Sequence, residues 1–137
     1  MADEKRVPPG QRLTADLPVL HVGPVMRVDP RDFTLALTGL VESQTVVDWE
    51  QLHTCPTLEQ TSDIHCVTGW TKLDTTWKGV RIADLLSPLT ISPRARHAVI
   101  HARGGWTTNL PIDELMRDDV LAAYEYEGRP LAPQHGG

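Results

Sequence analysis

Apolar residues alternate with polar or small residues in several short stretches of this chain. An alternation with a period of two is typical of strands that bury one face. The pair Gly104-Gly105 separates two of these stretches and predicts a hairpin. The strands expected from the pattern cover residues 33–41, 58–67, 97–102, 106–110 and 120–126.

Three other segments have the spacing of short helices. Asp48 is placed to cap a helix over 47–53, and the apolar positions of 82–86 lie on one helical face before Pro88 ends the segment. Segment 111–116 begins with proline and acidic residues, as a helix start does. Short strands interleaved with short helices predict an α+β fold, in which a β-rich mixed sheet domain carries short peripheral helices.

The two ends of the chain differ from its middle. Residues 1–30 are rich in proline and turn-forming residues, so we expect an extended N-terminal arm, followed by one domain over 31–137. The last segment, Leu131 to Gly137, is a loop that leads to no further element. A β-rich domain that stops there would have an unpaired edge, so we expect a C-terminally shortened chain.

Charge and hydropathy narrow the class of protein. A net charge of −5 over 137 residues argues against a nucleic-acid surface, which needs a clustered basic face. No apolar run approaches the roughly 18 residues that a membrane span requires. The charged start has no apolar core of a secretory signal, so we expect a cytoplasmic protein.

The segment Ile64 to Trp70 holds the most informative chemistry, a single thiol at the end of a predicted strand. Cys66 has no CxxC partner, so this pattern favours one soft ligand over a zinc cage. A cysteine buried as a small hydrophobe is the plain alternative. A disulfide with Cys55 is not expected in a reducing compartment.

Two other uses of the thiol stay open on the residues alone. Zinc takes Cys and His, but His65 and Cys66 are neighbours on a strand and point to opposite faces. A Cys–His nucleophilic pair is formally available without a supporting local signature. The residues of the zinc alternative are His53, Cys55, His65 and Cys66.

An ordered series of motifs resembles one family over residues 8–137. The series comprises Pro8 to Leu13, Pro18 to His21, Gly23 to Val25, Gly39 to Glu42, Asp63 to Trp70, Trp77 to Val80 and Leu131 to Gly137. In this order the motifs resemble the sulfite oxidase family of molybdopterin-dependent oxidoreductases. The chain is most similar to the small, haem-free prokaryotic members.

The resemblance implies a function and a set of site residues. It implies a molybdenum–molybdopterin cofactor, with Cys66 as metal ligand and catalytic residue, and the family's molybdopterin-binding fold. The further cofactor-binding candidates that it implies are His21, Thr68, Arg103 and His135. Either His65 or Thr68 is placed to tune the thiolate. The implied reaction is two-electron oxygen-atom transfer with a small oxyanion or heteroatom oxide. The chain has no haem segment, so a separate electron donor or acceptor is expected.

Two departures from the family pattern suggest an alternative to the oxidoreductase function. Relatives carry an arginine where this chain has Gly69, and an anionic substrate such as sulfite would use that charge. The family also continues past the His-Gly-Gly loop with a Pro-Val-Arg strand and a lysine-containing segment that hold the cofactor phosphate. The alternative is therefore a truncated, non-catalytic domain that serves as a binding or structural module.

Overall fold

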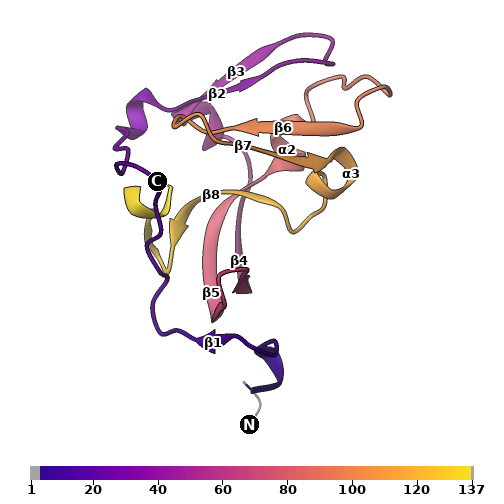
Figure 1. Cartoon of the computed structure of the whole chain (residues 1–137). Coiled ribbons are helices and arrows are strands. Elements are labelled where there is room, and N and C mark those ends of the chain that lie inside the picture. Colours follow the sequence, from indigo (N-terminus) through magenta and orange to yellow (C-terminus); the bar gives the residue numbers. More distant parts are fainter. Residues whose placement is uncertain (1–3, 137) are drawn as a thin grey trace. The chain divides into compact units, whose positions relative to one another are not determined.

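A computed structural model describes residues 4–136 of the chain. Short strands and shorter helices alternate along it, and the strands form a mixed sheet and two separate ribbons (Figure 1). This confirms the α+β, β-rich fold expected from the sequence. Met1-Ala2-Asp3 of the charged start, and Gly137 of the final loop, lie outside the described residues.

The largest sheet is organised around one long strand, β5. Its partners are placed on both sides, so β5 takes hydrogen bonds from several parts of the chain. The arm contributes β1, which runs parallel to β5 with Arg12 opposite Trp70 and Leu13 opposite Thr71. The strands are β1 (Arg12–Leu13), β4 (Thr57–Cys66), β5 (Trp70–Arg81), β8 (Leu121–Tyr126) and β9 (Arg129–Pro130), with β9 antiparallel to β8.

The chain divides into two compact units, which are described separately. The first contains the described residues of 1–25, 59–78 and 123–137, and so holds the arm and most of the large sheet. Trp70, Thr71 and Thr75 of β5 are buried there. Two 3-10 turns belong to this unit, η1 (Glu4–Arg6) and η3 (Pro133–His135).

The second unit contains residues 26–58 and 79–122. It has two antiparallel ribbons, and its buried apolar side chains are Leu52, Val80, Leu85 and Leu115. Leu52, Leu85 and Leu115 come from three short helices, each of which turns one leucine inward. The elements are η2 (Pro30–Asp32), β2 (Thr34–Leu37), β3 (Thr45–Asp48), α1 (Trp49–Leu52), α2 (Ile82–Leu86), β6 (His97–His101), β7 (Thr107–Pro111) and α3 (Ile112–Leu115).

The start of α1 is fixed by a capping box. The Asp48 carboxylate accepts a hydrogen bond from the Gln51 backbone N–H at 2.8 Å, and the Gln51 side chain accepts one from the Asp48 N–H at 2.9 Å. Two N–H groups that a helix start leaves unpaired are satisfied in this way. The cap expected at Asp48 is therefore confirmed.

Several predicted boundaries were wrong. The strand expected over 33–41 ends at Leu37, because Gly39 adopts a φ of 97° and turns the chain. The helix expected over 47–53 begins only at Trp49, since Val47 and Asp48 belong to β3. The sequence pattern did not predict β5 or β9, nor η3 within the final loop.

Candidate functional site at Cys66

Cys66 is the last residue of β4, and a three-residue loop joins it to β5. The Gly69 N–H donates to the Cys66 carbonyl at 2.9 Å, and Gly69 has a φ of 91°. A tight turn followed by a left-handed glycine is a common way to close a hairpin with a loop of this length. The turn holds the Cys66 side chain at the end of the hairpin, where it is half-buried and accessible to a ligand.

Thr68 favours ionisation of the Cys66 thiol. The Thr68 Oγ1 atom lies 3.2 Å from the Cys66 sulfur. Hydrogen bonds from the Thr68 hydroxyl, and then from its backbone N–H, lower the pKa of the Cys66 thiol, and partial desolvation opposes them. Donors that face a sulfur stabilise the thiolate, which is the form that binds metals. The chemistry of this donor suits a soft metal centre.

The backbone of Cys66 is also hydrogen-bonded to the N-terminal arm. The Gln11 side-chain amide donates to the Cys66 carbonyl at 3.2 Å. Backbone bonds flank this contact, from the Arg12 N–H to the Gly69 carbonyl at 3.0 Å and from the Thr14 N–H to the Thr71 carbonyl at 2.9 Å. The arm therefore lies directly against the hairpin that carries the thiol.

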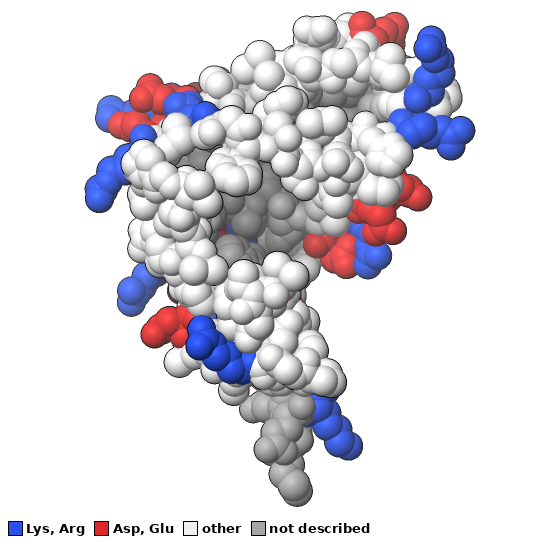
Figure 2. Space-filling view, viewed as in Figure 1, with Lys and Arg blue, Asp and Glu red and all other residues white. Residues whose placement is uncertain are grey.

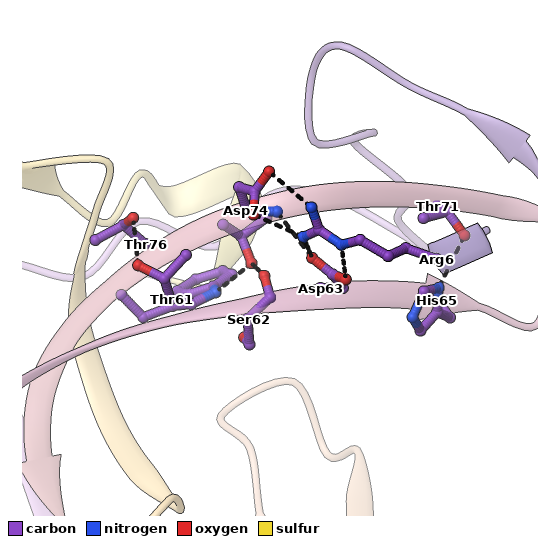
Figure 3. A network of polar contacts seen from close by, with 10 residues as sticks. Arg6, Thr61, Ser62, Asp63, His65, Thr71, Asp74 and Thr76 are labelled. Atoms are coloured by element: carbon purple, nitrogen blue, oxygen red, sulfur yellow. Dashed lines mark hydrogen bonds and ion pairs between the residues drawn. The ribbon is translucent and has the colours of Figure 1, made fainter. Parts of the chain in front are cut away.

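The arm makes a second set of contacts with the hairpin through Arg6 (Figure 3). The Arg6 guanidinium donates to both oxygens of Asp63, at 3.0 and 2.5 Å, and to Asp74 at 2.6 Å. The Asp74 backbone has a left-handed φ of 53°, and its N–H donates to Asp63 at 2.9 Å. Arg6 thus joins β4 and β5 a few residues from the turn.

His135 lies beside a cavity of about 310 Å³, within the size range of small-molecule sites. The lining includes the cation of Arg129 and the ring of Tyr126, whose centroid lies 6.4 Å from that of His135. The Tyr126 hydroxyl is buried and has no hydrogen-bond partner among the described residues. The full lining is Tyr126, Glu127, Arg129, Pro130, Ala132 and His135, so Cys66 and Thr68 do not contribute to it.

The other two expected residues, His21 and Arg103, have surroundings of their own. His21 is exposed in the irregular part of the arm. Arg103 belongs to the second unit, where its Nη2 atom donates to the Asp32 carbonyl at 2.7 Å. The contact between Thr68 and the Cys66 sulfur is the direct side-chain link that the structure shows within the expected set.

The zinc alternative finds no support in the described residues. No group of three or more His, Cys, Asp and Glu side chains among residues 4–136 is arranged to hold a metal ion. Cys55 and Cys66 are both free thiols.

The chain matches the family model described as the oxidoreductase molybdopterin binding domain, over residues 22–137. This chain belongs to that family. It is 42% identical over 132 residues to the uncharacterized oxidoreductase YuiH of Bacillus subtilis, a match that covers 96% of this chain and 67% of YuiH. It is 27% identical over 125 residues to the protein-methionine-sulfoxide reductase catalytic subunit MsrP of Gluconobacter oxydans, covering 78% of this chain and 40% of MsrP.

The fold of this chain is also found in a solved structure. The crystal structure of the sulfane dehydrogenase SoxCD from Paracoccus pantotrophus superposes with a TM-score of 0.72 at 21% identity, covering 82% of this chain and 33% of that one. This match confirms the expected fold. The chain spans about two thirds of YuiH and less than half of the MsrP and SoxCD chains.

The surface and the helices add two observations on this member of the family. On the face drawn in Figure 2, charged side chains occur singly or in small groups, and neither sign forms an extended patch. Across the described residues, the helices are too short and too polar for any of them to cross a bilayer.

Gln11 and Thr71 form contacts at the site that the sequence pattern did not predict. Gln11 is within the Pro-Pro-Gly-Gln motif, which was noticed only as part of the resemblance. Its partner Cys66 is 55 positions away in the sequence, so no local spacing indicates the contact. The only available signal was that a polar arm residue recurs in a family motif.

Proposed function

We propose that this chain binds a molybdenum–molybdopterin cofactor, with the Cys66 thiolate as the protein ligand of the metal, and that it acts as an oxidoreductase. The observation that carries the proposal is the thiol of Cys66 at the end of the β4–β5 hairpin, where the Thr68 hydroxyl lies 3.2 Å from its sulfur and lowers the pKa of the thiol. Membership of the molybdopterin-binding family supports the identity of the cofactor.

Such a cofactor supplies two-electron redox chemistry and exchange of one oxygen atom with a substrate. The protein holds, orients and tunes it. Cys66 offers one sulfur to the metal, and the Thr68 hydroxyl hydrogen bond limits how basic that sulfur is. His21, Arg103 and His135 stay candidates for contacts to the pterin or its phosphate. Among them, His135 has the support of a neighbouring cation, Arg129, at the same cavity.

The proposed substrate is a small oxyanion or heteroatom oxide. MsrP is named for methionine sulfoxide, and a relative from Glycine max that is 29% identical is named as an inducible nitrate reductase. Both names describe an oxygen-bearing acceptor. Gly69 brings no guanidinium beside the sulfur, so a neutral oxide is favoured over sulfite. We further propose a separate electron donor or acceptor and a cytoplasmic location.

The decisive measurement is the molybdenum content of the purified chain. The full chain is produced in cells that synthesise molybdopterin and is examined by elemental analysis. Cys66→Ser is compared with Cys55→Ser, which removes the other free thiol. We expect about one molybdenum per chain in the wild type and in Cys55→Ser, with a strong loss in Cys66→Ser.

Other metal contents have equally clear meanings. Substoichiometric molybdenum that Cys66→Ser does not change would contradict the proposal. That result would favour a non-catalytic domain with the same fold. One zinc ion per chain would support the zinc alternative instead.

A further inference from the structure

Among the described residues of the arm, Gln11 is the one whose side chain reaches the backbone of Cys66. Its two amide atoms face different strands. The Nε2 atom contacts the Cys66 carbonyl at 3.2 Å, and the Oε1 atom contacts the Thr71 hydroxyl. The side chain therefore bridges the end of β4 and the start of β5 across the turn that contains Thr68.

The Cys66 carbonyl oxygen determines the direction of the hydrogen bonds that Gln11 makes. A backbone carbonyl only accepts hydrogen bonds, so the Gln11 atom facing Cys66 is the donor Nε2. The Oε1 atom then faces Thr71, whose single hydroxyl proton goes to Gln11. Thr71 accepts in turn from the Nδ1–H of His65 at 2.9 Å, the contact drawn in Figure 3. A chain of hydrogen bonds thus runs from His65 through Thr71 and Gln11 to the Cys66 carbonyl.

The hydrogen bonds of this series are made at a buried position. Thr71 is fully buried, with 0% of its surface exposed, and a buried hydroxyl needs its partners. The Cys66 carbonyl also accepts from the Gly69 N–H, so the Gln11 amide and the turn share one acceptor. A carbonyl held from two directions fixes the peptide plane that follows Cys66. That plane leads directly into Val67 and Thr68.

We propose that Gln11 is a positioning residue that fixes the Cys66–Gly69 turn, and with it the direction in which the thiol meets its metal. This inference depends on the ligand role of Cys66 proposed above. Gln11 has no place in that chemistry, because it contacts the carbonyl and not the sulfur. It acts through Cys66.

Three variants separate this role from simple docking of the arm. Gln11→Met removes both amide contacts. Gln11→Glu keeps the acceptor for Thr71 but places an oxygen, not a donor, against the Cys66 carbonyl. Thr14→Val is the matched control, since the Thr14 hydroxyl bonds the Thr71 carbonyl at 3.3 Å from the same arm without reaching Cys66.

The first readout uses the full chain without cofactor and needs no metal. The exchange rate of the Gly69 backbone amide is measured by NMR. Releasing the peptide plane after Cys66 from Gln11 should let the turn open more often, so this rate is expected to rise roughly three- to tenfold in both Gln11 variants, and less than about twofold in Thr14→Val. Exchange within about twofold of the wild type in both Gln11 variants would overturn the proposal. An equal rise in Thr14→Val would do the same.

The second readout is the molybdenum content of the same variants made with cofactor. We expect both Gln11 variants to fall at least roughly threefold below Thr14→Val at equal thermal stability. Full loading of both Gln11 variants would overturn the positioning role. A wild-type chain without molybdenum would instead overturn the proposed function, so the two failures are distinguishable.

Discussion

The hydroxyl of Thr68 lies 3.2 Å from the sulfur of Cys66, across a turn that Gly69 closes with a backbone hydrogen bond. This short sequence contains the thiol, the hydroxyl that lowers its pKa and the glycine that makes the turn possible. The arm supplies the remaining constraint, through Gln11 on the carbonyl of the same cysteine. The environment of the thiol is therefore set by residues 66–69 together with residue 11.

Replacing Thr68 by valine should make the Cys66 thiol harder to ionise. Valine keeps the shape and the backbone N–H but loses the hydroxyl, which is the main cause of the lowered pKa of Cys66. Because the hydroxyl stabilises the thiolate, its loss should move the pKa of the thiol upward. Alkylation by iodoacetamide in a cofactor-free Cys55→Ser background should slow severalfold at neutral pH, with its pH midpoint shifted upward.

The control for this measurement is Thr54→Val, because the Thr54 hydroxyl bonds the Gln51 carbonyl in the second unit. Its alkylation profile should match that of the parent. An unchanged profile in Thr68→Val would show that the hydroxyl does not act on the sulfur.

Because of Asp63, the stability of the folded protein should decrease at acid pH. Hydrogen bonds from the Arg6 guanidinium, followed by the Asp74 backbone N–H, lower the pKa of Asp63. A lowered carboxylate pKa contributes stability above its ordinary value and loses it as the pH falls through the lowered value. In Asp63→Asn, the thermal unfolding midpoint should therefore vary less with pH between about pH 2 and about pH 6.

The size of this effect should be modest, because the pair is only partly buried and water screens it. A fall of no more than a few degrees at neutral pH is expected, and it should shrink at high salt. Asp16→Asn, an exposed change in the same arm, serves as the control. A pH profile that is the same in Asp63→Asn and the wild type would contradict the role of the Arg6 contact.

Local sequence signals were sufficient where the determining contacts are local. The cap at Asp48 is satisfied by a residue three positions later, and the Gly104-Gly105 break separates two strands that pair with each other. The position of Cys66 at the end of a strand followed from the same kind of pattern. These features need no knowledge of distant parts of the chain.

The parts that sequence reasoning missed depend on distant contacts. Lys72, Asp74 and Lys78 interrupt the apolar pattern of β5, and that strand is instead defined by its partners on both sides. β1 has only two residues and is a strand because it runs beside Trp70 and Thr71. Tertiary pairing of this kind overrides local propensity. The contact of Gln11 with Cys66 is a further example.

Gly69 should resist substitution for reasons of backbone conformation. Its φ of 91° is in the left-handed region, while the space around an added Cβ is empty. Gly69→Ala and Gly69→Arg should each lose about 1 kcal/mol of stability in urea unfolding, from strain and not from a clash. An arginine at this position would therefore carry the same backbone cost as alanine.

The control is Gly104→Ala, where φ is not left-handed and the added Cβ would meet Met26 and Trp106 at an ordinary 3.5 Å. That variant should unfold close to the wild type. Wild-type stability in Gly69→Ala would mean that the turn relaxes without cost.

Removing the Tyr126 hydroxyl should leave the protein as stable as before or slightly more so. The hydroxyl is buried without a partner in the described part of the chain, while its ring packs on Trp77 with centroids 4.7 Å apart. Tyr126→Phe keeps this packing and removes an unsatisfied polar group, so a gain of up to about 1 kcal/mol is expected in urea unfolding. Tyr126→Ala loses the ring and should cost about 3 kcal/mol, which shows that the assay detects this site. A clear loss of stability in Tyr126→Phe would show that the hydroxyl binds a water or ligand in the cavity beside His135.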